Sequence, residues 1–157
     1  MFMIGDKIVY PMHGAGIIEE IEEKKILGET RRYYILRVPC GDMKIMIPVD
    51  SSHDIGVRFV ASDAVLIDVM RTLEGESSEM SSNWNRRYRE NMEKLKTGCV
   101  IQVAEVVRNL MRTDREKKLS TGEKKMLSNA KQILLSEIIL IKGIELGDAT
   151  EIVEKAI

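Results

Sequence analysis

Apolar and polar positions in the first fifty residues alternate in short runs that are separated by glycine- and proline-containing segments. Alternation with a period of two marks half-buried β-strands, and Gly, Pro, Asn and Asp clusters mark turns. The pattern predicts strands at 7–10, 17–21, 32–38 and 43–49, with a turn at 39–42. Short strands without any helical period are typical of a small open β-barrel of the SH3 or Tudor type.

The pattern changes near residue 55, where apolar residues begin to recur at spacings of three and four. This spacing predicts amphipathic helices. Ser62 stands where a side chain can cap the first of them. Ser120 and the glutamate three residues later form a capping-box pattern, and Asp148 repeats it before a short last helix. About five helices are expected.

The two patterns divide the chain into two parts with separable cores. We expect residues 1–55 to form the Tudor-like or SH3-like β-barrel, and residues 56–157 to form a compact all-helical domain. The fold class is therefore α+β. A β module of this size buries little surface by itself and is usually a binding module.

One segment, residues 81–89, combines features that suit a nucleic acid. Ser81 or Ser82 can cap a helix, and Trp84, the single tryptophan, would stand at its start. A helix N-terminus attracts phosphate, and arginine forks match phosphate oxygens. Three arginines follow within about one turn: Arg86, Arg87 and Arg89. The alternative is a core tryptophan on a helix with a solvated basic face, but a helix start beside a polar linker is a poor place for a core.

The charge distribution supports the same segment. The whole chain has a formal net charge of −1, but residues 81–131 contain 13 Lys and Arg against 6 Asp and Glu, a net charge of +7. A basic block in a nearly neutral chain is the electrostatic footprint of nucleic-acid contact. Solvated salt bridges on a pair of helices would produce a similar count.

Other classes of function find little support. No apolar run approaches the ~20 residues of a membrane span, and the N-terminus does not resemble a signal peptide. Cys40 and Cys99 are read as reduced thiols, and with His13 and His53 they lack the spacing of a zinc site. No phosphate-binding glycine loop or nucleophile–base set stands out. We expect a cytoplasmic protein that is not an enzyme and needs no cofactor or metal.

Several segments together resemble one family. The opening, residues 5–16, looks like the start of the CarD/CdnL family, although transcription-repair coupling factors share that domain. The Asn-Trp-Asn-Arg-Arg-Tyr sequence at 83–88 makes the likeness specific. Further segments fit as well, so that the likeness covers nearly the whole chain: 33–36, 46–49, 94–98, 104–110 and 119–127.

The resemblance implies a bacterial transcription regulator. Its Tudor-like domain would bind the β subunit of RNA polymerase, and its helical domain would contact promoter DNA at the upstream edge of the transcription bubble. Trp84 matches the family tryptophan that wedges into the minor groove and stabilises the open complex. The DNA contacts would be largely independent of sequence, and the protein is expected to act as a nucleoid-associated monomer without membrane contact.

The resemblance also names further residues. Arg87, Arg89 and Lys124 match basic positions that contact the DNA backbone, and Arg86 lies in the same cluster. On the polymerase side, Lys24 matches a basic contact of some members. Met46 departs from those members that carry arginine there, and the strand that contains it and Lys44 could pair with a polymerase strand.

Two other functions remain open at this point. A helix-turn-helix repressor would need a recognition helix with base-reading side chains, usually in a dimer, and the basic helices here offer few Asn or Gln. A protein-interaction adapter without DNA contact would explain the basic helices as solvated surface.

Overall fold

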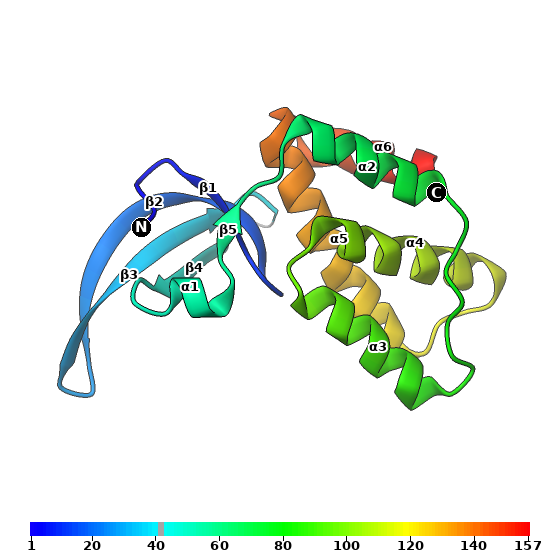
Figure 1. Ribbon diagram of the computed structural model, residues 1–157, viewed down its shortest axis with the longest axis horizontal. Coiled ribbons are helices and arrows are strands. Elements are labelled where there is room, and N and C mark those ends of the chain that lie inside the picture. Colours follow the sequence, from blue (N-terminus) through cyan, green and yellow to red (C-terminus); the bar gives the residue numbers. More distant parts are fainter. Residues whose placement is uncertain (41–42) are drawn as a thin grey trace.

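The computed structural model describes residues 1–40 and 43–157, and it is an α+β structure (Figure 1). An antiparallel sheet, blue to cyan in Figure 1, lies beside a group of helices, green to red. The turn predicted at 39–42 lies partly outside the described residues. The strands are β1 (Lys7–Tyr10), β2 (Gly14–Ile26), β3 (Glu29–Val38), β4 (Met43–Pro48) and β5 (Arg58–Phe59).

The five strands are ordered β4-β3-β2-β1-β5, so the sheet has β4 at one edge and β5 at the other and does not close into a barrel. The β2–β3 hairpin is long and projects away from the helices (Figure 1). β5 lies beyond residue 55 and pairs with β1, with Phe59 opposite Ile8. The sheet therefore includes residues that the sequence pattern assigned to the helical part.

The strands form where side chains alternate between a buried face and an exposed face. One face of β2, β3 and β4 carries fully buried side chains: Ile18, Tyr34, Leu36 and Ile47. These residues are β-branched, aromatic or long apolar side chains, which pack well on a pleated surface. The strands predicted from alternation at 7–10 and 32–38 are confirmed.

The helices are α1 (Ser52–Ile55), α2 (Asp63–Glu74), α3 (Trp84–Lys96), α4 (Val100–Glu116), α5 (Thr121–Lys142) and α6 (Leu146–Ala156). Ser62 and Ser120 accept backbone N–H groups at the starts of α2 and α5, as predicted. Asn83 caps α3, so the prediction of Ser81 or Ser82 is wrong. Asp148 lies inside α6, and the capping pattern predicted there is also wrong. No described helix is both long and apolar enough to cross a bilayer.

The sheet meets the helices mainly through α5 and β2. Ser136 of α5 accepts the backbone N–H of Ala15 at 2.9 Å, and its hydroxyl donates to the carbonyl of Ile133 at 2.7 Å. Gly14 has φ +116°, and a Cβ there would lie 2.9 Å from Ser136 Oγ. Glycine is therefore required for the close approach of β2 to α5. Buried residues of the sheet and of the helices belong to one hydrophobic cluster.

Candidate nucleic-acid interface

Trp84 is the first residue of α3, as the sequence predicts. The side chain of Asn83 accepts the backbone N–H of Arg86 at 3.0 Å, which fixes the start of the helix next to the tryptophan. The Trp84 side chain remains 41% exposed, although tryptophan is one of the most hydrophobic residues. An exposed aromatic ring at a helix start is available for contact with another molecule.

The indole of Trp84 is nevertheless held on three sides. Its Nε1–H donates to Ser120 Oγ at 2.9 Å, and its ring stacks on Tyr88 with centroids 5.2 Å apart and an interplanar angle of 21°. On the third side the ring lies close to Gly122, where an added Cβ would lie 3.3 Å from Trp84 Cζ2. The exposed ring is thus fixed between α3 and the first turn of α5.

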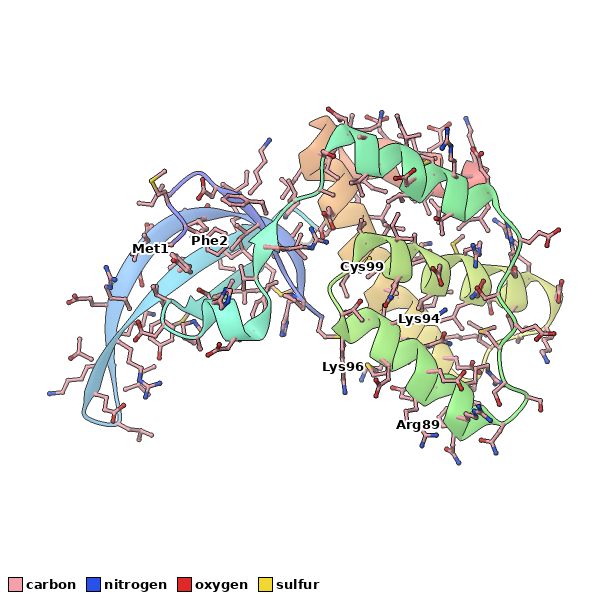
Figure 2. All side chains as sticks on the ribbon, in the orientation of Figure 1. Met1, Phe2, Arg89, Lys94, Lys96 and Cys99 are labelled. Atoms are coloured by element: carbon pink, nitrogen blue, oxygen red, sulfur yellow. The ribbon has the colours of Figure 1, made fainter. Side chains whose placement is uncertain are left out.

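Three of the predicted basic residues are exposed on the two helices that hold this ring. Arg86 pairs with Glu90 one turn later in α3 at 2.8 Å, in a surface contact that water can replace. Arg89 lies on the outer side of α3 and makes no ion pair with any residue that the structure describes (Figure 2). Lys124 is exposed in the first turn of α5, two residues after Gly122. Arg89 and Lys124 are free to meet phosphate oxygens, and Arg86 can do so after it leaves Glu90.

Arg87 is placed differently from its neighbours. Its Nε and Nη2 donate to the two carboxylate oxygens of Glu123 at 2.8 and 3.0 Å, and Nη1 donates to the carbonyl of Ser81 at 3.0 Å. Only 20% of its side chain and 4% of that of Glu123 is exposed. The two hydrogen bonds from Arg87 lower the pKa of Glu123, and the same contact raises the pKa of Arg87. The pair is therefore ionised.

A groove of about 590 Å³ runs between Trp84 and the segment that joins α4 to α5. Lys117 and Lys118 line it opposite the tryptophan and are exposed, without an ion-pair partner among the residues described. Neither lysine was predicted to contact DNA, although both belong to the charged run before Ser120, a signal that could have identified them. Lys117 and Lys118 in this groove, with the exposed cations Arg86 and Arg89 of α3 and Lys124 of α5, make up what we call the Trp84 rim. Its excess of positive charge suits a polyanion.

The polymerase-side residues named from the sequence share one face of the sheet. Lys24 pairs with Arg31, and on the next pair of strands Met46 lies opposite Ile35 and Lys44 opposite Arg37. Because alternate residues point to the same face, this register places all three on one side. Lys44 also contacts Glu19 at 3.3 Å, and Lys24 contacts Glu22 at 3.7 Å. Lys44 and Met46 belong to the edge strand β4.

Comparison with known proteins matches both halves of this structure. The family model for the CarD-like/TRCF RID domain matches residues 2–60, and the model for the CarD C-terminal domain matches residues 68–154. The chain is 47% identical over 144 residues to a Bacillus subtilis protein named "Putative transcription factor YdeB", covering 92% of this chain and 94% of the relative. The chain therefore belongs to the CarD/CdnL family.

Proposed function

We propose that the protein is a transcription factor that binds RNA polymerase through its sheet and promoter DNA through the rim around Trp84. The observation that carries the proposal is Trp84, which is 41% exposed and fixed in orientation, and which shares a groove with Lys117 and Lys118, two lysines without an ion-pair partner among the described residues. A fixed apolar ring in a positive surface has the chemistry of a minor-groove wedge. Family membership and the name of the relative agree with a role in transcription.

The wedge would act at the upstream edge of the transcription bubble. Inserting an apolar side chain between base steps costs the energy of unstacking, and this cost is lowest where the DNA is already partly melted. Arg89 and Lys124, with Arg86 after release from Glu90, would hold the DNA backbone without reading its sequence. Binding of the ring to the melted edge would slow reannealing and so stabilise the open complex.

The sheet would supply the polymerase contact, with the β subunit as the partner. The name of the family model that matches residues 2–60 connects this part of the chain with transcription-repair coupling factors. Edge strand β4 is free to add to a sheet of another protein, and Lys24, Lys44 and Met46 lie together on one face beside it. One copy of the protein would thus connect polymerase and DNA, with the functional division near residues 1–55 and 56–157.

The test is the lifetime of the open complex in the presence of the full-length protein. Preformed complexes of RNA polymerase on a promoter are challenged with a competitor, and their decay is followed with wild type and with Trp84→Ala. Wild type should lengthen the lifetime and Trp84→Ala should not. Because the ring is partly exposed, the variant should lose less stability than the ~3–5 kcal/mol typical of a buried tryptophan.

The matched control is Ile67→Ala, which removes an exposed apolar side chain from α2. This variant should keep the full effect on the lifetime. A large loss of thermal stability in Trp84→Ala with unchanged decay would contradict the wedge. Specific footprinting of duplex DNA without polymerase would favour a helix-turn-helix repressor, and the absence of any salt-dependent DNA binding would favour an adapter.

A further inference from the structure

The hydroxyl of Ser120 uses all of its hydrogen-bonding capacity at the Trp84 indole. It accepts from Trp84 Nε1–H at 2.9 Å and from the backbone N–H of Glu123 at 3.3 Å, and it donates to Glu123 Oε1 at 3.3 Å. A hydroxyl has one donor and two acceptor positions. Its proton therefore points to the carboxylate, which leaves a lone pair directed at the indole.

The carboxylate of Glu123 can orient this hydroxyl only while the carboxylate itself is fixed. The fork of Arg87 supplies that fixation through two parallel bonds of 2.8 and 3.0 Å. The third bond of Arg87, to the carbonyl of Ser81, holds the segment that precedes Trp84. A continuous path of hydrogen bonds thus leads from Arg87 through Glu123 and Ser120 to the exposed ring.

Arg87 and Arg86 are neighbours in sequence but differ in what they can offer to DNA. Arg86 is 67% exposed and holds a surface glutamate, whereas Arg87 is 20% exposed and holds a buried one. A phosphate that recruited Arg87 would leave Glu123 as a buried carboxylate without its partner, which is strongly unfavourable. Arg86 can change partner without such a loss.

We infer that Arg87 and Glu123 are positioning residues, which hold the Ser120 hydroxyl and through it the Trp84 indole, and that Arg87 is not itself a phosphate ligand. This differs from the role that the family resemblance implies for Arg87. A ring that is ordered before binding avoids an entropy cost when it binds. That this strengthens binding to DNA rests on the function proposed above. The orientation of the ring in the free protein does not rest on it.

A second ion pair between helices serves as the control, because it stabilises the packing of α3 without touching Trp84. Lys94 of α3 contacts Glu105 of α4 at 3.0 Å, so this pair also fastens α3 to a neighbouring helix. It includes none of the residues on the path to Trp84. Glu105→Gln should therefore weaken the packing of α3 without changing the surroundings of the indole.

The first experiment follows the fluorescence and near-UV circular dichroism of Trp84 in the full-length free protein. Because Trp84 is the single tryptophan, its signal is unambiguous. Glu123→Gln removes the charge, and Arg87→Lys keeps the charge but loses the fork. Both should increase quenching by acrylamide and weaken the near-UV signal, while Glu105→Gln should change neither.

The second experiment measures the salt dependence of binding to a duplex with a short unpaired bubble. Arg89→Gln should reduce the magnitude of the slope of log K against log salt by about 0.9, the value for one phosphate contact. Arg87→Gln should leave the slope unchanged while lowering affinity at every salt concentration. Far-UV circular dichroism checks that each variant is folded. If Arg87→Gln does not fold, Glu123→Gln is measured in its place.

Two outcomes would overturn the inference. One is an unchanged Trp84 signal in both Glu123→Gln and Arg87→Lys, which would show that the path does not hold the ring. The other is a slope reduced by about 0.9 in Arg87→Gln, which would make Arg87 a phosphate ligand. If wild type fails to lengthen the open complex, the proposed function fails instead, and the spectroscopic result still decides the positioning role.

Discussion

Arg58 of β5 and Glu137 of α5 form a two-point ion pair, with Nη1–Oε2 and Nη2–Oε1 distances of 2.8 and 2.9 Å. Arg58 also donates to the carbonyl of Gly98, between α3 and α4, at 3.0 Å from Nε and 2.7 Å from Nη2. Glu137 Oε2 also accepts the backbone N–H of Ala61, at 2.8 Å. One arginine thus ties the last strand of the sheet to two elements of the helical part.

Removal of this arginine should be costly. The side chain of Glu137 is 2% exposed, so Arg58→Ala would leave a buried carboxylate without its charge partner. Loss of one partner of a buried pair typically costs about 3–5 kcal/mol in free energy of unfolding, and Arg58, which is partly exposed, should fall at the lower end. Urea titration measures the loss. Arg31→Ala, which breaks an exposed pair with Glu29, should cost at most about 1 kcal/mol, and equal losses would contradict the prediction.

Two glycines should respond to alanine in opposite directions. A Cβ at Gly16 would lie 2.5 Å from the carbonyl oxygen of Arg37 and 2.8 Å from Leu36 Cγ, so β2 and β3 would have to separate. Gly16→Ala should therefore cost roughly 1–3 kcal/mol. Gly147 lies in α6 with open space around it, and Gly147→Ala should add about 0.5–1 kcal/mol of stability. The same sign for both changes in urea unfolding would show that backbone crowding does not decide the effect.

The polymerase contact should respond to charge on the exposed face of the sheet. Lys24→Glu should slow association with core RNA polymerase, because it reverses a charge at the rim of the proposed interface. Met46→Arg should have the opposite effect, since it adds a positive charge to the same face. Kinetics of the full-length protein binding to immobilised polymerase measure both. Lys155→Glu, on α6, is the control and should be neutral, and an unaltered rate for Lys24→Glu would place the contact elsewhere.

Much of the fold follows from local patterns. Strands such as β3 and the capped start of α2 at Ser62 could be predicted because alternation and capping depend on neighbours in sequence. Strand β5 has two residues, too few to show a period, and it exists because Arg58 and Phe59 pair with β1. The predicted start of α6 was wrong because a capping pattern at Asp148 stabilises a helix start only weakly. The burial of Ala149 and Val153 outweighs it.

The site could be predicted in part for the same reason. The exposed position of Trp84 followed from its place at a helix start beside a polar linker, which is local information. The pairing of Arg87 with Glu123 joins residues 36 positions apart and depends on how α3 packs beside α5. Sequence alone therefore treated Arg86, Arg87 and Arg89 as equivalent cations, whereas packing engages Arg87 in a partly buried ion pair.

The ion pair of Arg87 and Glu123 should make stability depend on pH in a definite direction. Because hydrogen bonds from Arg87 lower the pKa of Glu123 in the folded state, the unfolded chain takes up the proton first as the solution is acidified. The stabilisation is fully present at neutral pH. It is lost as the pH falls below about 4.3, the ordinary pKa of glutamate, and through the lower pKa of Glu123 in the folded protein.

Glu123→Gln has no such group to protonate. The difference in free energy of unfolding between wild type and Glu123→Gln should therefore be largest near neutrality and shrink on acidification, while other carboxylates cancel in the difference. Urea titrations at a series of pH values measure it, with Glu90→Gln, whose pair with Arg86 is exposed, as the variant that should show almost no pH-dependent difference. A difference that stays constant or grows toward acid pH would mean that the carboxylate of Glu123 does not stabilise the fold through its charge.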